Sequence, residues 1–135
     1  MIFENTFLQK CEAASRAGFP LYDEVGSLVG RGFADVGYEI FAVLPSGQLL
    51  SLLTGQTSRI LSEEERAHFF SVPDVDTLIE FLEERACTVE SFTRHDSREW
   101  HIALSHADGR VFTAIGGTLS EAILTVIHEG ILVSK

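Results

Sequence analysis

The sequence predicts a single α+β domain over residues 1–135, with an antiparallel sheet of four to six strands and helices packed mainly on one face. Its length is typical of one domain. Apolar types make up 45% and charged types 22% of the chain, which excludes a disordered tail or a fibre. Strand-forming residues recur as a hairpin over 38–53 and a meander over 88–115, and segments with helical periodicity separate them.

The N-terminal segment predicts a helix over residues 3–17, because Phe3, Phe7, Cys11 and Ala14 recur at helical spacing. Gly18 should end this helix as a left-handed cap. The segment 18–37 then contains five glycines but lacks the G-K-[ST] ending of a phosphate loop. We expect an irregular connector whose glycines allow positive φ or close backbone approach. A binding loop remains the alternative.

Two capped helices are expected after the hairpin. Ser62 and Glu65 form an S-x-x-E capping box, which predicts a short helix to about Phe70. A second helix should begin after Asp74 and run to about Arg85. Its apolar positions are Val75, Leu78, Ile79 and Leu82. These positions form one helix face, and carboxylates form the opposite face.

The meander should contain strands at 88–94, 99–106 and 110–115. Asp108-Gly109 predicts the second turn, and centring the turn on these two residues pairs His106 with Val111. One face would then carry Trp100, Ile102, Leu104, Val111 and Ile115, and this face should pack on a helix. Thr118 and Glu121 form a second capping box, which predicts a last helix ending at Gly130.

The charge is concentrated in one part of the chain. The net charge is −10, and residues 61–90 hold nine acidic and two basic residues. This segment should repel phosphate backbones, so we expect no direct nucleic-acid binding. It could attract a basic protein surface, and the alternative is a solvated face that keeps the protein soluble.

Our first functional hypothesis is a non-enzymatic cytosolic interaction module that docks a basic protein partner. The candidate partner-binding residues are Asp76, Glu80, Glu83, Glu84, Glu63 and Glu64. A narrower version is an inhibitor that imitates the phosphates of a nucleic acid.

The alternative hypothesis is a small enzyme or ligand-binding domain that uses His95, Asp96, His101 and the glycine-rich segment. The expected strand register places His101 and His106 on opposite faces, which disfavours a shared zinc ion. No G-x-S-x-G or H-E-x-x-H signature occurs. We therefore expect a binding protein rather than an enzyme, and assign no catalytic residue, metal or cofactor.

Cys11 and Cys87 lie far apart in the sequence without a C-x-x-C pattern, which favours a reducing, cytoplasmic compartment; a disulfide between them stays open. No apolar run reaches the roughly 18 residues of a membrane helix, and MIFENTFLQK does not resemble a signal peptide. Homodimerisation is compatible with both functional hypotheses.

Overall fold

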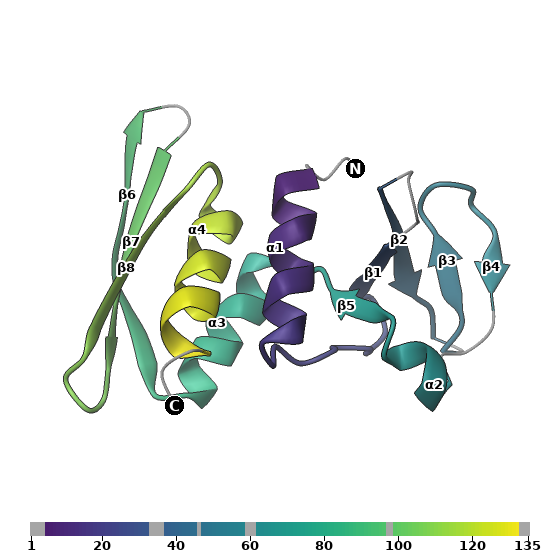
Figure 1. Cartoon of the computed structure of the whole chain (residues 1–135), viewed down its shortest axis with the longest axis horizontal. Helices are drawn as coiled ribbons and strands as arrows, with labels where there is room; N and C mark the ends of the chain where they lie inside the picture. The colour runs from purple at the N-terminus through teal and green to yellow at the C-terminus, as the bar shows by residue number, and fades with distance from the viewer. Residues whose placement is uncertain (1–4, 33–36, 46, 59–61, 97–98, 133–135) are drawn as a thin grey trace. The chain divides into compact units, whose positions relative to one another are not determined.

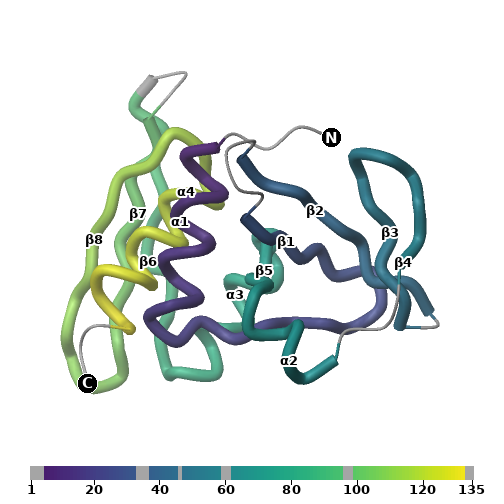
Figure 2. Tube along the Cα trace, turned by 45° about the vertical axis from the view of Figure 1, so that its right-hand side comes forward, coloured from purple at the N-terminus to yellow at the C-terminus, as the bar shows by residue number. Residues whose placement is uncertain are grey.

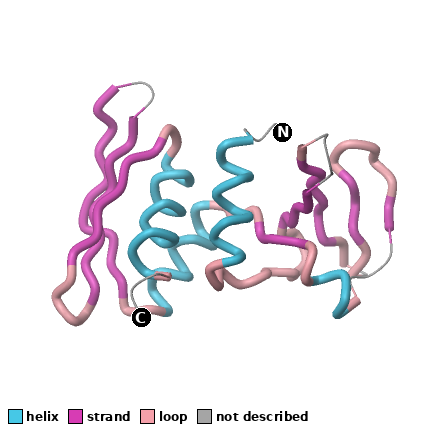
Figure 3. Tube along the Cα trace, in the orientation of Figure 1, coloured by secondary structure: helices cyan, strands magenta, loops and turns pink. Residues whose placement is uncertain are grey.

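The α+β class and the antiparallel pairing of the strands are confirmed. The computed structural model describes residues 5–32, 37–45, 47–58, 62–96 and 99–132. The described strands form two sheets rather than one, with five strands in the order β4-β3-β2-β1-β5 and three in the order β6-β7-β8 (Figures 1 and 3). The chain divides into two compact units, Met1–Val72 and Pro73–Lys135, and the hairpin and the meander fall in different units. The organisation as one domain stays a prediction.

The first unit contains two helices and the five-stranded sheet. Its elements are α1 (Asn5–Arg16), β1 (Leu28–Gly32), β2 (Tyr38–Val43), β3 (Leu49–Ser51), β4 (Thr57–Ser58), α2 (Glu63–Arg66) and β5 (Phe69–Ser71). The predicted N-terminal helix is confirmed from Asn5 onwards, because Phe7, Cys11 and Ala14 are buried along one side of α1. Phe3, the first residue of the predicted apolar stripe, lies outside the described residues. Gly18 adopts the expected left-handed conformation, with φ of 114°.

One face of this sheet, which we call the core face, carries a buried hydrophobic cluster of the first unit. Val29, Phe41, Val43, Leu49 and Phe69 form the buried cluster. The connection from α1 to β1 crosses the sheet before the chain turns into β1 (Figure 2). It is held in place by the amide of Tyr22, which donates to Ser71 Oγ, and by the amide of Gly26, which donates to the carbonyl of Val43. The sheet face is therefore partly covered by an irregular segment rather than by a helix.

Two predictions for the first unit are wrong in part. The glycine-rich segment is not an irregular connector throughout, because β1 runs through it. Close backbone approach is confirmed at Gly30, where a Cβ atom would lie 2.9 Å from Cζ of Phe70. The helix that begins after Ser62 ends at Arg66, and Phe69 and Phe70 belong to β5 instead. Pairing of β5 with β1 outweighs the local helical preference.

The second unit has the element order α3 (Val75–Glu84), β6 (Cys87–Asp96), β7 (Glu99–His106), β8 (Val111–Gly116), α4 (Leu119–Val126) and a π-helical turn η2 (Ile127–Ile131). Both predicted N-caps are confirmed. Asp74 accepts from the amide of Thr77, and Thr118 accepts from the amide of Glu121. The helices α3 and α4 lie on the same side of the sheet, as Figure 1 shows.

The predicted register between β7 and β8 is wrong by one residue. Val111 pairs with Ser105 rather than with His106. The amide of His106 bonds to the carbonyl of Arg110, and Gly109 has a φ of 95°, so three residues form the loop instead of two. A type I turn followed by a left-handed glycine has this geometry. The extra residue moves Val111 and Ile115 to the face of the sheet away from the helices.

Candidate functional site

The acidic face of α3 is the predicted partner-binding surface. The segment after Pro73 is helical, with Leu78, Phe81 and Leu82 buried on one side. The four carboxylates of the predicted face, those of Asp76, Glu80, Glu83 and Glu84, are all exposed. We call this set the α3 acidic face. Sequence reasoning missed Phe81, which is fully buried and makes the apolar side wider than expected.

No basic group among the described residues forms an ion pair with the α3 acidic face. Arg85 is the cation nearest in sequence, and its guanidinium lies over the ring of Phe81, 3.7 Å from the ring centroid. The helix therefore presents carboxylates to solvent without local neutralisation from the described part of the chain.

Glu63 and Glu64 lie in a different unit from the α3 acidic face. Both are exposed in the first turn of α2, where negative charge suits the N-terminal end of a helix. The cap itself is the predicted one, since the amide of Glu65 donates to Ser62 Oγ at 3.2 Å. The two sets of carboxylates therefore lie on separate helices, one in each unit.

The structure brings two of the histidines together. The rings of His95 and His101 lie with their centroids 3.9 Å apart, and Nε2 of His101 is 2.6 Å from Oε1 of Glu99. Asp96 pairs with Glu99 at the end of β6, while its side chain lies outside the described part of the structure. Among the described residues, no group of three or more potential ligands could hold a metal ion.

The two cysteine thiols are free and buried. Burial raises the pKa of Cys11 from its ordinary value of 9.0 to about 12. Burial is also the main cause that raises the pKa of Cys87, while Arg110 and Arg85 act in the opposite direction. Neither thiol is held as a thiolate, so neither is prepared to act as a nucleophile.

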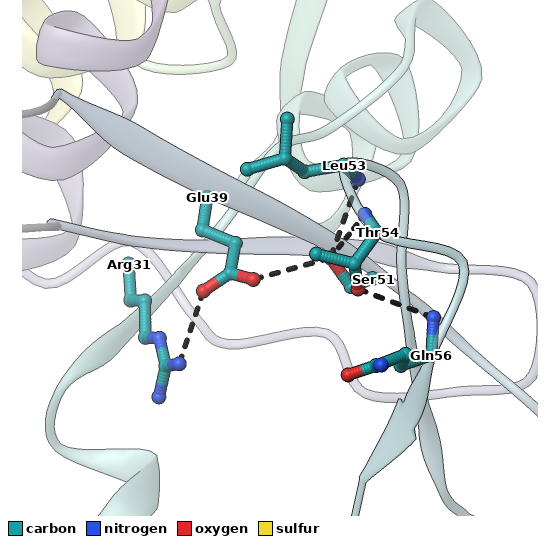
Figure 4. Close-up of polar contacts among 6 residues, drawn as sticks. All are labelled: Arg31, Glu39, Ser51, Leu53, Thr54 and Gln56. Atoms are coloured by element: carbon teal, nitrogen blue, oxygen red, sulfur yellow. Dashed lines mark hydrogen bonds and ion pairs between the residues drawn. The ribbon is translucent and has the colours of Figure 1, made fainter.

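A polar cluster that sequence reasoning missed lies on the core face of the five-stranded sheet. Arg31 and Glu39 are paired across β1 and β2, and Arg31 Nη2 donates to Oε1 of Glu39 at 3.0 Å. Ser51 Oγ donates to the other carboxylate oxygen at 3.1 Å (Figure 4). Glu39 is only 9% exposed, so this buried carboxylate is satisfied by two partners from neighbouring strands.

The turn after β3 fixes Ser51 in this cluster. The amides of Leu53 and Thr54 both donate to Ser51 Oγ at 3.2 Å, as Figure 4 shows. The amide of Ser51 donates to the carbonyl of Gln56. The hydroxyl therefore joins the turn to the buried carboxylate, which in turn orients Arg31.

Two hollows, which we call the Arg31 hollows, share this arginine in their lining. Their volumes are about 670 and 290 Å³. The guanidinium of Arg31 lies 5.1 Å from the centroid of the Phe41 ring and 5.7 Å from that of Phe69. Its side chain is 41% exposed. An arginine held by a carboxylate and two rings while still facing solvent can bind a polar ligand.

One signal in the sequence could have found this cluster. The alternation of Glu39, Phe41 and Val43 along the predicted strand places a carboxylate on the same side as two core residues. A charged residue that points into the core needs an ion-pair or hydrogen-bond partner. The alternation along this strand does not reveal which residue that partner is. The partner, Arg31, comes from the glycine-rich segment for which we predicted no strand.

No protein-family model, curated protein or solved structure matches this chain. None of the described helices has the length and apolar composition needed to cross a membrane.

Proposed function

We propose that the protein is a non-enzymatic interaction module that docks a basic protein partner through the α3 acidic face. The observation that carries the proposal is the exposure of all four carboxylates on one helix whose other side is buried. A fixed row of like charges attracts an oppositely charged surface and accelerates the encounter, and this effect weakens as salt is added. Glu63 and Glu64 are proposed as a second set of partner-binding carboxylates, on α2 of the first unit.

The spacing of the charges supports the narrower version, in which the module imitates a nucleic acid. From Asp76 to Glu84 the helix rises by about 12 Å, and the successive carboxylates are separated by about 6, 4.5 and 1.5 Å of axis, with a mean of ~4 Å. Phosphates along one DNA strand follow each other at about 3.4 Å of axis. A protein that binds a phosphate backbone is therefore the partner class that we propose to test first.

The test is charge reversal at two exposed positions, Glu80→Lys and Glu84→Lys, in one double variant. Lysine is a good helix former, so α3 should persist. Partners are captured from native lysate at low and high ionic strength and quantified by mass spectrometry. We expect basic nucleic-acid-binding proteins on the wild-type chain at low salt, and their loss from the double variant.

The matched control is Glu24→Lys with Glu129→Lys, which changes the net charge equally at exposed positions outside α3. The control should retain most of the capture. Equal losses in both double variants would mean that total charge, rather than the α3 acidic face, attracts the partner. Unchanged capture by the α3 variant would remove the proposal.

A second candidate function is binding of a small polar ligand at the Arg31 hollows. The orientation of Arg31 by Glu39 and by two aromatic rings favours it. The test is a thermal-shift screen of small carboxylates and phosphates against the wild-type chain and Arg31→Met. Arg94→Met, which removes an exposed arginine in the second unit, is the control. Shifts that survive in Arg31→Met would contradict this site.

A further inference from the structure

The strand β8 forms one edge of the three-stranded sheet, and it carries no charged residue. Its residues Val111–Gly116 read VFTAIG. In the described part of the chain, β8 is hydrogen-bonded to β7 alone. Edge strands in soluble proteins usually carry charges, proline or bulges that prevent pairing with another chain. Because β8 lacks these features, its free edge is suited to pairing with a strand of another chain.

The backbone of β8 has outward groups at alternate residues. The bond from the amide of His106 to the carbonyl of Arg110 closes the turn at 2.8 Å. The alternation of an antiparallel ladder then directs the N–H and C=O groups of Val111, Thr113 and Ile115 away from β7. The same three side chains lie on the face away from the helices, where Val111 is 67% and Ile115 is 54% exposed.

We propose that two copies of this chain associate through β8, as an antiparallel strand pair with two-fold symmetry centred on Thr113. In this register Thr113 lies opposite the partner's Thr113, and Val111 lies opposite the partner's Ile115. Each pair exchanges two backbone hydrogen bonds, because all three residues direct these groups outward. The exposed valine and isoleucine then form cross-strand apolar pairs.

The opposite edge of the sheet is less suited to self-association. The strand β6 contains Glu90 and Arg94, and its chain neighbour α3 packs against it. Pairing through β6 would bring two α3 acidic faces towards each other, which like charges oppose. The distribution of charge therefore selects β8 as the edge that a second copy can meet.

The expected dimer is weak. One pair of six-residue strands buries less than the roughly 800 Å² per partner of a stable interface. Sedimentation velocity of the wild-type chain should therefore show an average sedimentation coefficient that rises with concentration. Thr113→Lys places two like charges opposite each other at the symmetry axis and should abolish this rise.

The matched control is Thr93→Lys, which adds the same charge at an exposed position on β6. It should associate like the wild type. Circular dichroism verifies that each variant is folded, and Ile115→Lys replaces Thr113→Lys if that variant unfolds. A wild-type chain that stays monomeric at its highest soluble concentration would overturn the proposal.

Cysteine cross-linking tests the register without disrupting it. In the proposed pair the two Thr113 Cα atoms lie about 5.5 Å apart, within the range of a disulfide. Thr113→Cys should therefore oxidise to a covalent dimer, and Thr93→Cys should not. Val111→Cys alone should stay uncrosslinked, since the two copies lie about 13 Å apart along the strands. A mixture of the Val111→Cys and Ile115→Cys variants should cross-link, because these two positions lie opposite each other in the proposed pair. Equal cross-linking at all positions would overturn this register.

Discussion

Arg31 and Glu39 form an ion pair across two neighbouring strands, with Nη2 of the arginine 3.0 Å from Oε1 of the glutamate. The glutamate side chain is 11% exposed and the arginine side chain 41%. The pair therefore spans the boundary between the core of the first unit and solvent. It explains how the core face of the sheet can contain a carboxylate, because the charge is paired and hydrogen-bonded.

Arg31→Met should lower the free energy of unfolding by about 1–3 kcal/mol, because it removes the arginine that pairs with the buried carboxylate of Glu39 and leaves the bond from Ser51 Oγ. Urea denaturation measures this change. Glu39→Gln removes the charge and keeps an acceptor for Ser51. The double variant should therefore lose less stability than the sum of the two single variants, and strict additivity would contradict the coupling.

Gly30→Ala should destabilise the first unit by about 1–3 kcal/mol through overpacking. A methyl group at this position would lie 2.9 Å from Cζ of Phe70, a ring that is almost fully buried. Gly32→Ala is the control on the same strand, since the nearest atom to its new methyl group would be Glu12 Oε2 at 3.7 Å. Chemical denaturation should show a larger loss in the free energy of unfolding for Gly30→Ala than for Gly32→Ala. Equal losses would contradict the close approach at Gly30.

The cysteines should resist alkylation in the folded protein. Both thiols are buried, and burial raises the pKa of each. Iodoacetamide at mildly alkaline pH should modify neither residue in the native state and both in urea. Mass spectrometry of the alkylated chain gives the measurement. Rapid native modification of Cys87 would show that the strand β6 opens far more often than its burial implies.

The raised pKa of Cys11 has a consequence for stability at high pH. Below pH 9 the folded and unfolded states both hold the proton, so the thiol adds no pH dependence. Between pH 9 and about 12 the unfolded state releases it more readily, and the free energy of unfolding falls as pH rises. Cys11→Ala should reduce the dependence of the free energy of unfolding on pH in this range. Tyr38→Phe is the comparison, because burial and its bond to Glu12 raise the pKa of Tyr38 as well.

Asp108 should titrate below its ordinary value of 3.8. The amide of Arg110 donates to its carboxylate at 3.0 Å and is the main cause of the lowered pKa, and the Arg110 side chain adds to it. The ionised carboxylate of Asp108 therefore stabilises the turn at pH values above 3.8. This stabilisation is lost as the pH falls through the lowered pKa of Asp108. Carboxyl NMR titration tests this. Arg110→Ala keeps the backbone bond and should remove only part of the shift.

The helices were the most predictable part of the fold, because their signals are local. The caps at Ser62, Asp74 and Thr118 place an acceptor three residues before an amide, and the structure confirms all three. The extent of the helix after Ser62 was not predictable in the same way. Phe69 is in a strand because β1 supplies a pairing partner from a distant part of the chain.

The polar cluster and the β8 edge needed tertiary information. Arg31 lies between two glycines, which are not typical of a strand. Its pairing with Glu39 could therefore not be predicted from either segment alone. The register of β8 depends on one extra loop residue with Gly109 in a left-handed conformation. That single residue exchanges the buried and exposed faces of β8, and with them the exposure of Val111.

The division of the chain at Val72 affects the order in which its parts can fold. Every strand of the five-stranded sheet comes from residues before Pro73. Domains fold as units during synthesis, with the N-terminal part first. All five strands of this sheet are therefore synthesised before the acidic helix and the meander.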